Sequence, residues 1–158
     1  MRTKQAKLRE TVADSKYGSV LVSQLINRSM RSGKKTVAQK HVYMALEMVA
    51  EKTSKKPLEI LESALRNITP QMEVRTRRVG GASYQVPMPV RTRRGASLAV
   101  RWLVNEANKR ANSEFHTFAE KLAAEILAAA DNTGGSIEKK LTSHRMAESN
   151  KAFSHFRW

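Results

Sequence analysis

Two prolines that lie two residues apart, Pro87 and Pro89, most constrain what this chain can fold into. The residues around them favour a β-strand. Residues two apart in an antiparallel strand direct their N–H groups to the same side, and proline has no N–H group. That side of the strand therefore cannot pair with a third strand. The sequence predicts a sheet of two strands, and other elements must supply the rest of the fold.

The predicted sheet is a β-hairpin. Its strands are the β-favouring runs Met72 to Val79 and Tyr84 to Arg91, and the segment between them forms its tip. Gly80 and Gly81 accept the backbone angles of a tight turn. We expect a ribbon about 20 Å long at ~3.3 Å per residue that stands off the helices. Because an isolated hairpin is marginally stable in water, we also expect partial flexibility in the free protein.

Apolar residues recur at helical spacing in three segments before the hairpin. The first segment runs from Gly18 to Met30, and the second follows Thr36, a predicted N-cap. The third begins at Pro57, which suits the first helical position, and ends before Pro70. The sequence thus predicts three helices in its first half.

Three more helices are predicted after the hairpin. The fourth contains Leu98 and Ala107, the fifth is expected to be capped by Ser113, and the sixth by Ser136. The predicted fold class is mainly α, with six helices and one protruding two-stranded antiparallel β-hairpin. We divide the chain into a basic N-terminal arm at residues 1–16 and a single helical domain at residues 17–158, with the hairpin arm at about 72–91.

The segment from Val74 to Arg101 contains seven arginines and no lysine, aspartate or glutamate. The planar guanidinium group pairs bidentately with phosphate and stacks on bases, so this choice favours a nucleic-acid partner over general solubility. Strand alternation places Arg75 and Arg77 on one face and Arg78 on the other, so both faces carry cations. Alternatively, the arginines only deter aggregation of a solvated edge, although lysines would serve equally well. The seven arginines are Arg75, Arg77, Arg78, Arg91, Arg93, Arg94 and Arg101.

The overall charge indicates the same class of partner. The chain has 29 Lys+Arg against 14 Asp+Glu, a formal net charge of +15 and an isoelectric point near 10.6. Such a protein attracts polyanions. The absence of cysteine suits a reducing compartment, and no apolar run approaches the ~18 to 20 residues of a membrane span. We expect an intracellular protein that binds nucleic acid.

No arrangement of residues predicts an enzyme, a metal site or a cofactor. The segment Gly33 to Thr36 differs from a P-loop, because Arg28 and Lys35 occupy positions where that motif needs Gly and Ser/Thr. We interpret Lys34 and Lys35 as a cationic turn that can hold a backbone phosphate. The four histidines lack metal-ligand spacing, and no Ser-His-Asp or paired-carboxylate pattern stands out.

The C-terminal residues interleave cations with aromatic side chains. His144 stands beside Arg145, and His155 lies between Phe153 and Arg157. This pattern suits stacking on unpaired bases. The same aromatic residues would equally serve to pack the tail onto the body, so both interpretations stay open. His41, in contrast, lies on an apolar face and is expected to pack in the core.

Three separated motifs stand out, the segments Met30 to Lys35, Arg77 to Pro87 and His144 to Phe153. They closely resemble the S-seven family of bacterial small-subunit ribosomal proteins. The resemblance runs from about Asp14 to Trp158, and three motifs in the same order make it highly specific. It implies a six-helix bundle with a protruding hairpin. It also implies a structural, non-enzymatic protein that binds the head (three-prime major) domain of small-subunit ribosomal RNA and nucleates its assembly.

The resemblance further implies which residues contact RNA. They come from the N-terminal arm, the turn between the first two helices, the hairpin and the start of the fourth helix. These residues are Arg2, Lys4, Lys7, Lys34, Lys35, Arg75, Arg77, Arg78, Arg91, Arg93 and Arg94. We add the remaining candidate cations Arg101, His144, Arg145, Lys151 and Arg157.

The family also implies neighbours other than ribosomal RNA. The hairpin tip would lie near the exit-site tRNA and the mRNA path, with the head protein S-nine and the platform protein S-eleven nearby. The tip residues are Val79, Gly80, Gly81, Ala82, Ser83 and Tyr84. One departure from the family concerns Gly95, which stands where the second arginine of a pair is usual, so Arg93 is expected to contact something different.

Two other functions remain as alternatives. A DNA-binding architectural or regulatory protein could place the basic helices and the β-ribbon in a DNA groove. A module that binds acidic proteins would keep its RNA affinity unchanged when Arg77 and Arg78 are replaced by glutamate. Our preferred prediction is a small-subunit ribosomal protein, located in a cytoplasmic or an organellar ribosome.

Overall fold

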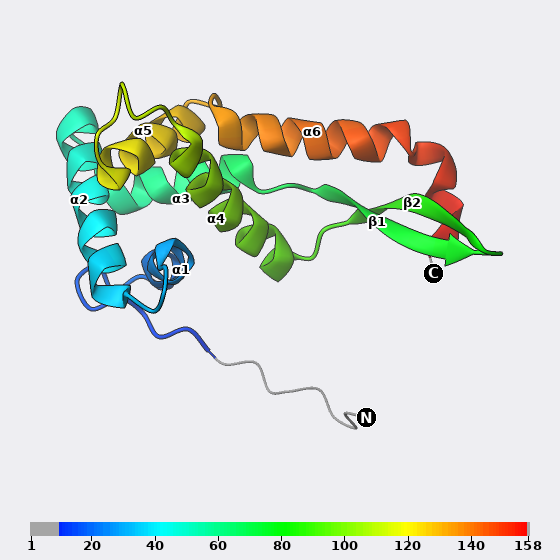
Figure 1. The fold of residues 1–158 in the computed structure, drawn as a ribbon, viewed down its shortest axis with the longest axis horizontal. Helices are drawn as coiled ribbons and strands as arrows, with labels where there is room; N and C mark the ends of the chain where they lie inside the picture. The colour runs from blue at the N-terminus through cyan, green and yellow to red at the C-terminus, as the bar shows by residue number, and fades with distance from the viewer. Residues whose placement is uncertain (1–9, 158) are drawn as a thin grey trace.

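The protein, described here by a computed structural model over residues 10–157, is mainly helical. Six α-helices, one short 3-10 helix and one hairpin follow each other in this part of the chain (Figure 1). The prediction of six helices with one two-stranded antiparallel hairpin is confirmed. The elements are α1 (Val20–Ser29), α2 (Lys35–Thr53), α3 (Pro57–Ile68), β1 (Met72–Val79), β2 (Ala82–Pro89), α4 (Thr92–Lys109), α5 (Phe118–Ala130), α6 (Gly135–Ser149) and η1 (Lys151–Phe156).

The hydrophobic core lies among α1 to α5, with α5 packed against α2, α3 and α4. Each helix presents one apolar stripe to this centre, as the helical spacing predicts. Burial of a large apolar side chain stabilises the fold by roughly 1.5–3 kcal/mol. Within this core cluster, the large apolar side chains with no more than 1% exposure are Val22, Leu25, Ile26, Val42, Leu46, Val49, Leu61, Ile68, Leu103, Leu122 and Ile126.

The hairpin has the predicted tight turn but a different second strand. β1 and β2 pair from Met72 opposite Pro89 to Val79 opposite Ala82, so Gly80 and Gly81 alone form the loop. Both glycines have positive φ, 56° and 91°, which a two-residue hairpin turn with the right twist requires. The strand predicted at Tyr84 to Arg91 therefore begins earlier, at Ala82, because Ala82 and Ser83 continue the ladder.

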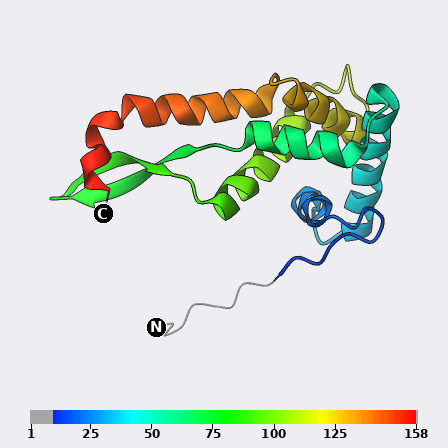
Figure 2. The same ribbon diagram turned by 180° about the vertical axis from the view of Figure 1, so that it is seen from behind.

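Our prediction that the hairpin stands off the helices was wrong. The hairpin does extend beyond α1 to α5, but α6 lies beside its base (Figures 1 and 2). Ser143 Oγ donates to Met72 O at 3.2 Å, and the Gln71 N–H donates to His144 Nε2 at 3.0 Å. The prolines keep a third strand from the hairpin edge but do not prevent a helix from covering its face.

The short helix η1 covers the far part of the hairpin. The Tyr84 ring lies 5.3 Å from the ring of Phe153 and 5.3 Å from that of Phe156, measured between centroids. Val86 in the same strand is completely buried. Of the two interpretations of the C-terminal aromatic residues, the structure supports packing onto the body for Phe153 and Phe156.

The predicted cap of the fifth helix was wrong. α5 begins after Thr117, whose Oγ1 accepts a hydrogen bond from the Glu120 N–H at 3.3 Å, while Ser113 lies in the preceding loop. Glu120 Oε2 in turn accepts from the His116 N–H at 2.9 Å. The Thr-x-x-Glu spacing is that of a capping box and is visible in the sequence, but here the His116 N–H, one residue before the cap, donates to Glu120. The bonds from Thr117 and His116 lower the pKa of the Glu120 carboxyl.

The predicted caps of α2 and α6 were also wrong. Thr36 lies inside the first turn of α2, where Lys34 occupies the cap position without a side-chain bond. Ser136 lies one residue inside α6 and is fully buried. Its hydroxyl donates to Glu125 Oε1 at 2.6 Å, because this end of α6 packs on α5.

Residues before α1 already contact the helices. Asp14 is 7% exposed, and its carboxylate accepts hydrogen bonds from the N–H groups of Lys16 and Tyr17 and from the Tyr43 hydroxyl of α2. The division between arm and domain at residue 16 stays a prediction. None of the helices in residues 10–157 has both the length and the apolar composition that a membrane span requires.

Candidate nucleic-acid interface

The base of the hairpin is joined to α4 by one carboxylate. Glu73 in β1 is 6% exposed and accepts from Arg75 Nε at 2.7 Å and from Arg94 Nε at 2.6 Å. Burial opposes the charged form of Glu73, but the two arginines outweigh it, so the pKa of its carboxyl lies below the ordinary value. Arg75 and Arg94 are half-exposed and are each held in place by this carboxylate.

The sequence indicates only half of this cluster. Glu73 and Arg75 lie two apart on a strand and so share a face. Nothing in the spacing shows that Arg94, which lies 21 residues later, would reach the same carboxylate. The contact depends on how α4 leaves the hairpin, which is a tertiary feature.

The first turns of α4 carry a second group of cations. Arg91 occupies the N-cap position without a side-chain cap bond, while Arg93 lines a cleft of about 450 Å³ together with Arg28 of α1. Ser97 in this cleft and Arg101 beyond it follow Arg93 at intervals of four residues, which places all three along one face of α4. Arg91, Arg93 and Arg101 are exposed. Arg28 was not among the predicted residues.

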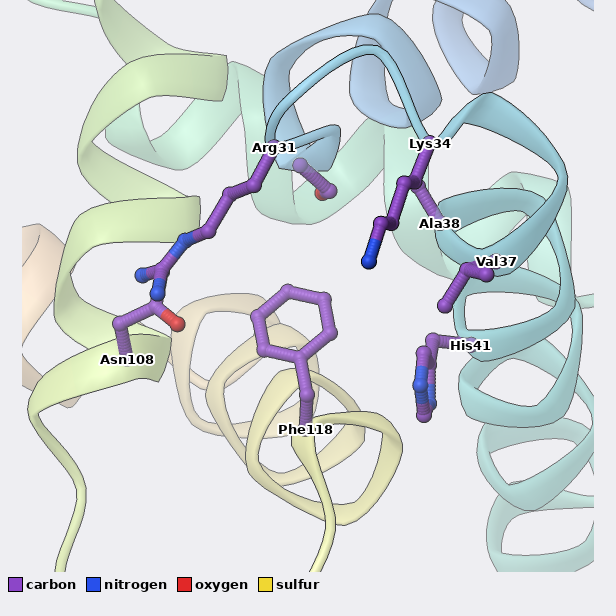
Figure 3. A pocket seen from close by; sticks show the side chains of 8 residues that line it. Arg31, Lys34, Val37, Ala38, His41, Asn108 and Phe118 are labelled. Atoms are coloured by element: carbon purple, nitrogen blue, oxygen red, sulfur yellow. The ribbon is translucent and has the colours of Figure 1, made fainter.

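The turn between α1 and α2 presents three exposed cations, Arg31, Lys34 and Lys35. Gly33 at its centre has φ of 72°, in the left-handed region that glycine adopts without strain. The turn lies at the bundle end of the molecule, opposite the hairpin tip (Figure 1). Arg31 and Lys34 also line a cavity with side chains of α2, α4 and α5 (Figure 3).

The outer part of the hairpin combines cations with a solvent-exposed loop. Arg78 is exposed and Arg77 is half-buried. The tip residues Gly80, Gly81, Ala82 and Ser83 are exposed, and no atom lies within 4 Å of where a Cβ would stand at either glycine. Val79 is half-buried, as is Tyr84, whose ring packs against Phe153 of η1. Backbone at the tip is therefore open to a close approach by a partner.

His144 has a structural role in the described chain. Its Nε2 accepts a backbone hydrogen bond from Gln71, which requires the neutral ring. Burial, and then the positive charge of Lys140, lower the pKa of His144 below its ordinary value. A neutral ring that is already bonded to the backbone contributes no positive charge to an RNA surface.

The other C-terminal cations are exposed. Arg145, Lys151 and Arg157 all belong to this group. Lys151 and Arg157 line a groove of about 350 Å³ between the hairpin, α6 and η1. The helix η1, which begins at Lys151, contacts β2 and lies far along the molecule from the turn between α1 and α2 (Figure 1).

The remaining predictions concern the N-terminal cations, His41 and metal binding. Arg2, Lys4 and Lys7 fall outside the described residues. His41 is half-buried rather than fully in the core, and its ring meets that of Phe118 edge-on. In residues 10–157, no three His, Asp or Glu side chains gather where they could hold a metal ion.

Comparison with known proteins gives one consistent result. The family described as ribosomal protein S7p/S5e matches residues 1–151. The small ribosomal subunit protein uS7 of Caldanaerobacter subterraneus subsp. tengcongensis is 55% identical over 150 residues, covering 95% of this chain and 94% of that protein. Its counterpart in Thermotoga petrophila is 52% identical over 158 residues, covering 100% of both chains. That of Caldicellulosiruptor saccharolyticus is 54% identical over 152 residues, covering 96% of each.

Proposed function

Since the chain belongs to the ribosomal protein S7p/S5e family, we propose that it is a structural constituent of the small ribosomal subunit that binds ribosomal RNA. It would recognise a folded junction of RNA helices by shape and by phosphate and 2′-hydroxyl contacts, because A-form grooves offer side chains little sequence information. The role requires no catalytic step.

The observation that carries this proposal is the distribution of exposed cations over elements with fixed relative positions. Arg31 and Lys34 lie at the turn between α1 and α2, Arg93 at the start of α4, and Arg78 on the hairpin. Glu73 and α6 join the hairpin to α4, and α1 packs against both α2 and α4. Such a surface can engage several RNA elements at once and set their relative orientation.

We further propose the finer role that the family suggests. The protein would bind the head domain of the RNA early and nucleate its assembly, with the N-terminal arm at residues 1–16 adding contacts. The exposed hairpin tip would lie near the exit-site tRNA and the mRNA path. Its protein neighbours would include S-nine and S-eleven. The open backbone at Gly80 and Gly81 supports a close approach at this tip.

A competition experiment tests the proposal. The full chain is titrated with a transcript of the head domain of small-subunit ribosomal RNA and with duplex DNA, at several salt concentrations. We expect preference for the RNA by orders of magnitude at physiological salt, and a salt slope of roughly 0.7 to 0.9 per phosphate neutralised. Equal affinity for both would favour the DNA-binding alternative, and salt-independent affinity would contradict both functions.

A further inference from the structure

A cavity of about 230 Å³ lies beneath the turn between α1 and α2, bounded by α2, the end of α4 and the start of α5. Pockets for drug-sized ligands range from roughly 300 to 1,000 Å³, so this cavity suits a single planar ring with its substituents. Its polar and aromatic lining comes from Ser29, Arg31, Lys34, His41, Asn108 and Phe118.

Three kinds of group converge on this cavity (Figure 3). Arg31 and Lys34 reach over it from the turn, and the Phe118 ring lies between their side chains. Cations hold phosphates, and aromatic rings stack on bases. The lining therefore offers separate contacts for the backbone and the base of one nucleotide.

Asn108 supplies the third kind of group. Its amide nitrogen donates to Val104 O at 2.8 Å, while its amide oxygen accepts no hydrogen bond from residues 10–157. Figure 3 shows this oxygen directed toward the space beside Phe118. It is placed to accept from an N–H group on the edge of a base.

Two buried polar atoms at the cavity lack a partner. Within residues 10–157, neither Ser29 Oγ nor His41 Nδ1 makes a hydrogen bond. Burying an unpaired polar atom is unfavourable, and such atoms in native proteins call for an explanation such as a bound group. The His41 ring is positioned by its edge-on contact with Phe118, with 6.2 Å between ring centroids.

We propose that this cavity receives one unpaired nucleotide of the RNA partner. Its base stacks on Phe118 and donates an N–H to the Asn108 amide oxygen, while Arg31 and Lys34 hold its phosphate. The inference rests on the proposed function and deepens it, because it names a site for a single splayed-out base. A backbone phosphate alone would leave the ring and the amide unused, and a paired base cannot enter a cavity of this size.

Three substitutions test the proposal in the full chain. Phe118→Leu removes the stacking face but keeps an apolar side chain, Asn108→Ala removes the acceptor, and Arg31→Ala removes a cation. Lys52→Ala is the matched control, since Lys52 is exposed in the last turn of α2, at the opposite end from the turn. Each variant is titrated with the head-domain transcript at several salt concentrations, after thermal unfolding has verified its fold.

We expect Phe118→Leu and Asn108→Ala each to weaken RNA binding, Phe118→Leu by about fivefold or more, with an unchanged salt slope. Arg31→Ala should weaken binding and lower the slope by roughly 0.7 to 0.9, and Lys52→Ala should change neither. Ultraviolet crosslinking of the wild-type complex should join a nucleotide to the peptide that contains Phe118, which checks the site without any substitution.

The outcomes separate the two proposals. RNA binding that Phe118→Leu and Asn108→Ala leave intact, with no crosslink at Phe118, overturns the nucleotide site and leaves the proposed function standing. A wild-type chain with no preference for ribosomal RNA over duplex DNA overturns the proposed function, and the nucleotide site with it.

Discussion

Glu73 at the start of the hairpin holds Arg94 in the first turn of α4, with 2.6 Å between Oε2 and Nε. The carboxylate therefore joins the first strand of the hairpin to α4. Arg75 Nε donates to the other oxygen at 2.7 Å. One buried carboxylate thus holds Arg75 and Arg94, two cations whose pairing with it was not predicted from the sequence.

Replacing Glu73 with glutamine should lower the free energy of unfolding by about 1–2 kcal/mol, because two half-exposed arginines lose a charged acceptor. Urea unfolding measures the change. Glu59→Gln serves as the control, since Glu59 makes only an exposed pair with Lys56. Equal stability of the two variants would show that the Glu73 cluster contributes nothing specific.

The effect of Glu73→Gln on the free energy of unfolding should also depend on pH. The folded pKa of Glu73 lies below its unfolded value, so its contribution is complete above the unfolded pKa of about 4.3. That contribution is lost as the pH falls through the folded pKa. The difference in unfolding free energy between wild type and Glu73→Gln should therefore shrink on acidification below about pH 4.3. A difference that grows toward low pH would have the wrong sign.

Glu125 should be the least replaceable acid in residues 10–157. It is 1% exposed and accepts from Arg110 Nε at 2.9 Å and from the Ser136 hydroxyl at 2.6 Å. Glu125→Ala leaves these donors unpaired and should cost about 3 kcal/mol or more of unfolding free energy. Glu138→Ala, an exposed carboxylate in the first turn of α6, should cost far less in the same thermal or urea assay.

Tyr84→Ala should release η1 from the hairpin. The ring contacts of Tyr84 with Phe153 and Phe156 contribute roughly 0.5–1.5 kcal/mol each beyond burial. Amides in β2 should then exchange with solvent about tenfold faster or more, as hydrogen-exchange mass spectrometry would detect. Ser83→Ala, at the exposed neighbouring position, should leave the exchange rate unchanged. Unaltered exchange in Tyr84→Ala would mean that η1 does not stabilise the strand.

Arginines with and without a carboxylate partner should differ in RNA binding. Arg78→Ala removes an exposed cation and should lower the salt slope of binding by roughly 0.7 to 0.9. Arg94→Ala should lower it less, because Glu73 already offsets that charge. Titration of both variants with RNA at several salt concentrations measures the two slopes. Equal slopes would show that Glu73 does not offset the charge of Arg94.

Much of the fold could be predicted from local patterns. Pro87 and Pro89 limit the sheet to two strands, and Pro57 marks the start of α3 at the predicted residue. The helix caps were less predictable, because several polar residues precede each apolar stripe. Thr117 caps α5 instead of Ser113 because Thr117 and Glu120 together satisfy two backbone donors, the N–H groups of Glu120 and His116, which a single serine cannot do.

The residue types of the candidate site could be predicted from the sequence, but their spatial arrangement could not. The arginine-rich segment is evident from the sequence, whereas the pairing of Arg94 with Glu73 requires the path of the chain between β2 and α4. His144 resembles a surface cation in sequence, but its bond from Gln71 joins residues 73 positions apart. Likewise, Asn108 and Phe118 line the same cavity as Arg31 only because α4 and α5 pack beside the turn between α1 and α2.

The packing of α6 along the hairpin has a mechanical consequence. A lone two-stranded ribbon bends and twists easily, whereas a ribbon held by α6 at its base and by η1 farther out should resist both. We therefore expect the turn between α1 and α2 and the hairpin tip to keep a nearly constant separation. Two RNA segments bound at these ends would then be held at a fixed distance from each other by the protein.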